Sequence, residues 1–170
     1  LFAPHYARAE AMHVTAPGAF VRGKGAADAS AVSQLLHGEA FHLLDVTGGW
    51  AWGFCGHDGY VGYIERELLA TDAGAPNNSV TAIAAPVFAQ ADIKSPVLGT
   101  LPCAALVSGD RAGDFLATQD GYIHLRHVAA IDAYDTDWVA VAERFLGQPY
   151  VWGGRGYGGL DCSGLVQIAL

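Results

Sequence analysis

Positively charged residues are scarce in this 170-residue chain, which has nine lysines and arginines against seventeen aspartates and glutamates. The formal net charge is −8, and the basic residues are dispersed along the sequence. Phosphate binding depends on clustered lysine and arginine, so the composition argues against a nucleic-acid partner. An acidic surface would instead tolerate cationic or amine-bearing substrates.

Long hydrophobic runs are also absent, because no stretch approaches the roughly twenty apolar residues that span a bilayer. We therefore expect no membrane partner. The opening sequence LFAPHYARAEA has neither the basic start nor the apolar core of a signal peptide. The chain also begins without methionine, which leaves open a natural N-terminus further upstream, with any export signal.

Cysteine is rare as well, with three residues that are too few and too scattered for a disulfide framework or a zinc site: Cys55, Cys103 and Cys162. Reduced thiols in a cytoplasmic protein fit this pattern best. His124 and His127 do not indicate a metal site, because residues three apart on a strand face opposite sides and no third ligand is evident. The sequence thus predicts neither a metal nor a cofactor.

The residues that are present predict a folded, mainly β chain. Only 15% are charged and 52% are apolar. Short apolar runs broken by glycine, proline, asparagine and aspartate dominate from Ala19 to Ile131, without a sustained helical period. Successive strands are expected at Glu39–Val46, Gly49–Cys55 and Gly59–Ile64, joined by turns at residues 47–49 and 57–59.

This layout recurs further along the chain. Asp58–Val61 (DGYV) is matched by Asp120–Ile123 (DGYI), and Leu35-Leu36 by Val97-Leu98, both at an offset of 62 residues. A shared offset at two separate places predicts a duplicated domain. The turn-rich stretch Ala70–Val80 between the copies suits a linker.

A helical pattern follows Asp132. Thr136–Gly147 predicts an amphipathic helix of about three turns, with Thr136 or Asp137 as N-cap and Gly147 as C-cap. The glycine-rich residues 152–160 predict a loop. The apolar run Ser163–Leu170 then predicts a second, buried helix, for which Asp161 is a good N-cap candidate.

Cys162 stands out because it would lie at the N-terminus of this second helix. Unpaired N–H groups and the helix dipole there favour the thiolate over the thiol, which provides a nucleophile. An unreactive buried cysteine behind a glycine corner is the alternative. A phosphate loop fits less well, because no Lys-Ser/Thr follows the last glycine and Asp161 would repel an anion.

Two segments resemble bacterial SH3-like (SH3b) domains. The stronger is QLLHGEAFHLLDVTGGWAWGFCGHDGYVGYIERELL (Gln34–Leu69), which has Gly-Glu before a strand, Gly-Trp after a turn, and the strand GYVGYI. The second is VLGTLPCAALVSGDRAGDFLATQDGYIHLRHVAAI (Val97–Ile131), which keeps the outline without the tryptophans. The resemblance implies two small β-barrels in tandem.

The segment FLGQPYVWGGRGYGGLDCSGLVQ (Phe145–Gln167) resembles the opening of the NlpC/P60 family of papain-like cysteine peptidases. The resemblance implies that Cys162 is the nucleophile and that Tyr150 lies beside the thiol and helps to hold the oxyanion. It also implies that Asp161 and Ser163 line the pocket for the N-terminal end of the substrate. A carboxylate such as Asp161 can pair with a substrate ammonium.

Tandem SH3b domains before such a peptidase resemble the subgroup that acts on peptidoglycan-derived peptides with a free N-terminal L-Ala. That subgroup cleaves between γ-D-Glu and the diamino acid, and its first SH3b domain closes one end of the groove. The residues of this chain that could contribute there are Glu39, Tyr60 and Tyr63, for which ordinary strand and turn roles are the alternative. Recycled peptides are small and intracellular, so the resemblance implies a cytoplasmic enzyme of murein recycling.

The family's catalytic histidine lies downstream of the cysteine, and this sequence has none there. All seven histidines precede Cys162: His5, His13, His37, His42, His57, His124 and His127. We therefore expect a truncated peptidase, inactive as a 170-residue chain, whose final apolar helix lacks the sheet it should pack against. The well-ordered part would be the SH3b pair.

The expected fold is two SH3-like barrels followed by the helical N-terminal part of a papain-like α+β domain. Its boundaries are an extension at 1–18, SH3b domains at 19–74 and 79–132, and an incomplete peptidase domain at 133–170. The expected function is a γ-D-glutamyl-L-diamino acid endopeptidase. Alternatives are a non-catalytic SH3b module that binds wall peptides and, less well supported, an acyltransferase; the diamino acid and the oligomeric state stay open.

Overall fold

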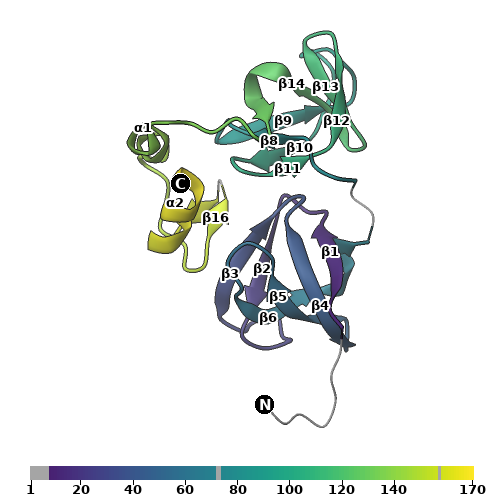
Figure 1. The fold of residues 1–170 in the computed structure, drawn as a ribbon, viewed down its shortest axis with the longest axis vertical. Helices are drawn as coiled ribbons and strands as arrows, with labels where there is room; N and C mark the ends of the chain where they lie inside the picture. The colour runs from purple at the N-terminus through teal and green to yellow at the C-terminus, as the bar shows by residue number, and fades with distance from the viewer. Residues whose placement is uncertain (1–7, 72–73, 157) are drawn as a thin grey trace.

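The protein is mainly β, as expected, with a short helical segment at its C-terminal end (Figure 1). The computed structural model describes residues 8–71, 74–156 and 158–170. The first β unit contains β1 (Glu10–Val14), β2 (Gly18–Arg22), β3 (Ala31–Leu36), β4 (Ala40–Thr47), β5 (Trp50–Cys55), β6 (Val61–Glu65), the 3-10 helix η1 (Arg66–Leu68) and β7 (Leu69–Ala70).

A second β unit and a C-terminal segment follow. The second β unit contains β8 (Asn78–Val80), β9 (Ala84–Phe88), β10 (Val97–Pro102), β11 (Leu106–Val107), β12 (Gly109–Ala112), β13 (Phe115–Thr118), β14 (Gly121–His124), η2 (Leu125–His127) and β15 (Val128–Ala130). The C-terminal segment contains α1 (Trp138–Glu143), β16 (Arg155–Gly156), β17 (Gly159–Leu160) and α2 (Cys162–Ala169).

The first β unit is one antiparallel sheet with the strand order β3-β2-β6-β5-β4-β1-β7. The three strands expected between residues 39 and 64 are confirmed as β4, β5 and β6. Alternate side chains point into a core that includes Met12, Phe41 and Ile64. The boundary at residue 19 is wrong, because β1 pairs with β4 and so belongs to this sheet rather than to an extension.

The second β unit repeats the strand order of the first. Its sheets run β10-β9-β14-β13-β12 and β11-β8-β15, which match β3-β2-β6-β5-β4 and β4-β1-β7. The long strand β4, whose register shifts between Leu43 and Asp45, corresponds to the two short strands β11 and β12. The two units therefore share one topology.

The pairing of Leu35-Leu36 with Val97-Leu98 is a wrong prediction. In the sheets Leu35 lies opposite Ala19, and the residue that lies opposite Ala85 in the second unit is Leu101. Leu35 and Leu101 are both buried, whereas Val97 and Leu98 are exposed. The sequence distance between corresponding strands is not constant, since β3 and β10 start at Ala31 and Val97 but β6 and β14 start at Val61 and Gly121, so one fixed offset cannot align the two units throughout.

The expected linker and first helix are both too long. β8 begins at Asn78, inside the stretch expected to be a linker, because it pairs with β11 and β15. The first helix covers only Trp138–Glu143, and Gly147, with φ of +87°, follows three residues after its C-cap. Asp137 is its N-cap and accepts a hydrogen bond of 3.0 Å from the N–H of Ala140.

The glycine-rich stretch is not wholly a loop, because β16 and β17 pair within it as a two-residue antiparallel hairpin. The second helix is confirmed as α2 with Asp161 as its N-cap, but it is only partly buried, with Gly164 and Ile168 as its buried residues. Figure 1 shows β16 beside β3 of the first β unit, with α2 next to β16. The described residues contain no helix with the length and apolar character needed to cross a bilayer.

A third core joins the three parts of the chain, separate from the cores of the two β units. Its buried residues come from both β units and from the C-terminal segment: Leu36, Cys103, Val141, Phe145, Leu160 and Ile168. Ile168 thus packs inward from α2, while Val166 and Leu170 are exposed. The C-terminal segment is therefore held against both β units.

Candidate active site

Asp161 fixes the start of α2 through both of its carboxylate oxygens. Oδ1 accepts hydrogen bonds from the N–H of Gly164 at 2.7 Å and the hydroxyl of Ser163 at 2.8 Å. Oδ2 accepts from the N–H of Gly153 at 2.9 Å, which ties the glycine-rich stretch to the helix. The first residue of the helix after this cap is Cys162, so the cap determines where the thiol lies.

Glycines allow the chain to close tightly around this point. A Cβ on Gly164 would lie 2.2 Å from the carbonyl oxygen of Gly154, so only glycine permits α2 to approach the preceding stretch this closely. The N–H of Asp161 donates to that same carbonyl at 3.0 Å. The glycines predicted to be loop residues therefore also allow close contacts between backbone segments.

Tyr150 lies next to Cys162 because its strand-like segment runs beside Leu160. Tyr150 and Leu160 form an isolated β-bridge, and the N–H of Val151 donates to the carbonyl of Leu160 at 3.1 Å. Tyr150, Asp161 and Cys162 share one pocket of about 380 Å³. The rest of that pocket comes from the end of α1, the turns after it, β17 and α2: Ala142, Phe145, Leu146, Gly147, Gln148, Pro149, Leu160 and Leu165.

Cys162 is the exposed thiol of the chain. The other two cysteines are buried, and all three are free, as the sequence predicts. Burial, helped by the neighbouring charge of Asp58, raises the pKa of the Cys55 thiol, and burial also raises the pKa of the Cys103 thiol. These two thiols stay protonated, so Cys162 is the sulfur that can meet a substrate.

Two groups around the thiol have shifted pKa values. Desolvation, then the interactions with Cys162 and Asp161, raise the pKa of Tyr150, so its phenol keeps its proton at neutral pH and remains a donor. For Asp161, desolvation alone raises the pKa, but the hydrogen bonds from Gly164, Ser163 and Gly153 outweigh it and the net pKa is lowered. Asp161 is therefore a carboxylate at neutral pH.

The remaining predicted site residues do not all meet at this pocket. Ser163 donates its hydroxyl to Asp161 and so supports the cap. Tyr60 is exposed near the start of β6, and Tyr63 lies in a separate groove on the outer face of the first β unit. Glu39 is buried between the first β unit and the C-terminal segment.

Arg155 is the residue that sequence analysis missed. Its guanidinium forms a bidentate ion pair with the Glu39 carboxylate, at 2.7 and 3.0 Å, and both side chains are buried. Gln34 completes the contact, because its side-chain oxygen accepts from the N–H groups of Arg155 and Gly156 at 2.8 and 3.0 Å. These bonds hold the hairpin that precedes Cys162 against β3.

The described residues contain no cluster of three or more histidine, cysteine, aspartate or glutamate side chains that could hold a metal ion. His124 and His127, considered as ligands from sequence, have ring centroids 6.0 Å apart. No histidine is among the described residues that line the Cys162 pocket. The chemistry visible in this pocket is therefore that of a thiol, a phenol and a carboxylate.

A family model matches most of the first β unit. Residues 21–69 match the model described as the bacterial dipeptidyl-peptidase Sh3 domain. This stretch runs from β2 into β7. The first β unit is therefore similar to a bacterial SH3 domain of the dipeptidyl-peptidase type.

One solved structure shares the fold of most of this chain. A crystal structure of an NlpC/P60 family protein from Bacillus cereus aligns with 94% of this chain and 71% of its own, with a TM-score of 0.73 and 16% identity. NlpC2 and NlpC1 from Trichomonas vaginalis align with 97% and 98% of this chain and 66% and 64% of their own, at 16% and 17% identity and TM-scores of 0.37. No curated protein matches the chain. The chain thus shares the fold of the B. cereus NlpC/P60 family protein.

Proposed function

We propose that this chain supplies the nucleophile of a cysteine peptidase that hydrolyses cell-wall peptides, as a γ-D-glutamyl-L-diamino acid endopeptidase. The observation that carries the proposal is the exposed Cys162 thiol at the start of α2, beside Tyr150 and Asp161 in one pocket. The match of the first β unit to a dipeptidyl-peptidase SH3 domain and the fold likeness to an NlpC/P60 family protein support the same class.

The proposed reaction is acyl transfer through Cys162. The thiolate attacks the carbonyl carbon of the γ-amide, and the tetrahedral intermediate expels the diamino acid as its amine, which takes up a proton. Water then hydrolyses the thioester and releases L-Ala-γ-D-Glu as the free acid. The protonated phenol of Tyr150 donates to the oxyanion, where a preorganised donor stabilises the developing charge.

In the proposed peptidase, Asp161 provides the selectivity for substrates with a free N-terminus. Its carboxylate is ionised and borders the pocket of Cys162, so it can pair with the ammonium group of an N-terminal L-Ala. The same carboxylate already accepts three hydrogen bonds from within the chain, so it is held in place before the substrate arrives. Acetylation of the substrate removes the charge that Asp161 recognises.

The reaction also needs a proton acceptor for the thiol. We assign this part to a histidine outside the described lining of the pocket.

Peptide digestion tests the proposal. The complete gene product is incubated with L-Ala-γ-D-Glu-diaminopimelate and with its N-acetylated form, and the products are separated and identified by mass spectrometry. We expect L-Ala-γ-D-Glu and diaminopimelate from the first peptide and no cleavage of the second. Cys162→Ala should abolish turnover, whereas Cys55→Ala, which alters a buried thiol of the first β unit, should not.

Two outcomes would contradict parts of the proposal separately. Turnover that persists in Cys162→Ala removes the nucleophile assignment. Equal cleavage of the free and acetylated peptides removes the role of Asp161 and leaves the peptidase itself intact.

A further inference from the structure

The outer face of the first β unit carries large aromatic side chains that the core does not use. Along β5 the residues alternate, so Ala51 and Cys55 point inward while Trp50 and Trp52 point outward. On the neighbouring strand β6, Tyr63 lies directly opposite Trp52. Trp52 has an exposed fraction of 38%, so part of its indole surface faces solvent.

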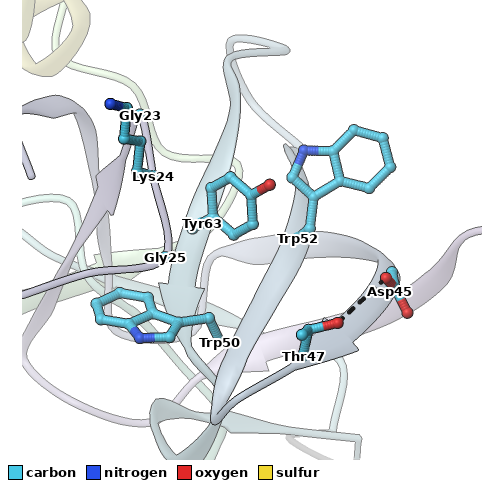
Figure 2. Close-up of a pocket in the computed structure, with 8 residues that line it drawn as sticks. All are labelled: Gly23, Lys24, Gly25, Asp45, Thr47, Trp50, Trp52 and Tyr63. Atoms are coloured by element: carbon cyan, nitrogen blue, oxygen red, sulfur yellow. Dashed lines mark hydrogen bonds between the residues drawn. The ribbon is translucent and has the colours of Figure 1, made fainter.

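These aromatic residues form the floor of a groove of about 550 Å³. Figure 2 shows the ring of Tyr63 between the side chains of Trp50 and Trp52. One wall is the loop after β2, where glycine brings the backbone close to an indole: a Cβ on Gly25 would lie 3.1 Å from Cγ of Trp50. The groove has the size of a site for a small ligand.

Polar side chains line the groove beside these aromatic residues. Lys24 contributes an ammonium donor, Asp45 a carboxylate acceptor, and Thr47 a hydroxyl that serves as both. Within the chain, Asp45 accepts from the N–H of Val46 at 2.9 Å and from Thr47 at 3.5 Å, marked in Figure 2 for Thr47. A carboxylate has about four lone-pair positions, so Asp45 keeps capacity for a ligand.

We propose that this groove binds pyranose rings of a glycan. A pyranose has a face of C–H groups that packs flat on an indole or phenol ring, and a rim of hydroxyl groups that both donate and accept. The aromatic side chains can pack against the C–H face of the sugar, while Lys24, Asp45 and Thr47 can form hydrogen bonds with its hydroxyl groups. This site is independent of the proposed peptidase activity, because it shares no lining residue with the pocket of Cys162.

A proline-rich peptide is the competing occupant, since such peptides dock in aromatic grooves. Proline has no N–H group, so a polyproline segment offers carbonyl acceptors and hardly any donors. Covering Asp45 with such a ligand would leave the remaining acceptor positions of its carboxylate without donors, which is unfavourable. A sugar supplies hydroxyl donors to that carboxylate, so the polar groups of the groove favour a glycan.

Binding experiments on the complete gene product test this proposal. Titration with the β-1,4-linked tetrasaccharides of N-acetylglucosamine and of glucose, followed by calorimetry and tryptophan fluorescence, should show binding by at least one of them. Trp52→Ala should weaken that binding by about tenfold or more, because it removes the central stacking surface. Trp138→Ala is the matched control, since Trp138 is an exposed tryptophan on α1, away from the groove.

Asp45→Asn is a second variant that leaves the aromatic floor intact, at an exposed position, and should weaken sugar binding severalfold. If Trp52→Ala does not fold, the sugar binding of Asp45→Asn still tests the proposal. The proposal is overturned if neither tetrasaccharide binds at millimolar concentration, or if both groove variants bind like the unaltered protein. Binding of a proline-rich decapeptide in place of the sugars would also overturn it.

Discussion

Glu39 and Arg155 form a buried ion pair between residues 116 positions apart in the sequence. Their exposed fractions are 8% and 5%, so neither charge has much water around it. Glu39 also accepts a hydrogen bond of 2.8 Å from the N–H of Leu36. Because a buried charge without its partner is strongly destabilising, each member of this pair depends on the other.

Glu39→Ala should therefore lower the free energy of unfolding by about 3–5 kcal/mol, because it leaves the Arg155 guanidinium buried and unpaired. Chemical denaturation of the chain measures this change. The control is Asp135→Ala, which removes an exposed ion pair with Arg144 and should leave the unfolding midpoint nearly unchanged. Similar shifts for the two variants would show that the Glu39–Arg155 pair is not effectively buried.

Ala104 is the one described non-glycine residue with a positive φ, of +68°. It occupies the place of Gly38 in the first β unit, where φ is +78°. The N–H of Gly38 donates to the carbonyl of Val14 and the N–H of Ala104 to the carbonyl of Val80, both at 2.8 Å. Each valine is the last residue of the first strand of its unit. The second unit thus keeps the turn of the first without its glycine.

Ala104→Gly should stabilise the chain. A left-handed alanine costs about 1–2 kcal/mol, and the greater freedom of glycine in the unfolded state offsets about 0.5–1 kcal/mol of the gain. The reverse change, Gly38→Ala, should destabilise by more than strain alone, because the new Cβ would lie 2.2 Å from the carbonyl oxygen of Leu106. Urea midpoints of the two variants measure both effects, and a lower midpoint for Ala104→Gly would refute the equivalence.

At the scale of elements, sequence patterns predicted the strands and helix ends that are determined by residues close in sequence. β4, β5 and β6 follow from alternation and glycine turns, and the start of α2 follows from its Asp161 cap. β16 and β17 were missed because two-residue strands carry no periodicity, and the bonds that fix β16 come from Gln34 in another sheet.

The same reasoning explains how much of the candidate site was predictable. Tyr150, Asp161 and Cys162 lie within one short stretch, so their chemistry and spacing are visible in sequence. The ion pair between Glu39 and Arg155 was not predictable, because no local sequence feature indicates which residue of the first β unit contacts an arginine in a glycine-rich stretch. Tyr63, named from sequence as one of three residues that could contribute to the substrate groove, lines the separate aromatic groove.

The cap of α2 makes a prediction about pH. The pKa of Asp161 is lowered in the folded state, so its ionised form stabilises the fold above the unfolded pKa of about 3.9, and this contribution is lost as pH falls through the folded value. Asp161→Asn keeps a capping side chain without the charge. Unfolding at pH 7 and near pH 3 should therefore show a gap between the two proteins that closes in acid. A gap of equal size at both pH values would contradict this.

Asp161→Ala separates the capping bond from the charge. At pH 7 it should cost about 0.5–2 kcal/mol, because the N–H of Gly164 loses its acceptor at the start of α2. Asp161→Asn should be the milder of the two variants at this pH. Equal unfolding free energies for the alanine and asparagine variants would mean that the hydrogen bond to Gly164 does not stabilise the helix.

At the scale of the whole molecule, the third core determines whether the chain behaves as one body. Leu36 enters it from the first β unit, Cys103 from the second, and Phe145 and Ile168 from the C-terminal segment. The β units also meet directly, since the N–H of Leu106 donates to the carbonyl of His37 at 2.8 Å. The position of Cys162 thus depends on packing that no single unit provides.

Phe145 and Leu146 offer a matched pair for testing that dependence, because they are neighbours in sequence with exposed fractions of 6% and 82%. Phe145→Ala should cost about 3–5 kcal/mol through the cavity it leaves in the third core, whereas Leu146→Ala should have little effect. Hydrogen exchange followed by mass spectrometry should show faster exchange in β16, β17 and α2 of the Phe145 variant, with β5 and β6 unchanged. If α2 exchanges at the same rate in both variants, the third core does not hold the thiol in place, because the helix would then keep its protection without the packing of Phe145.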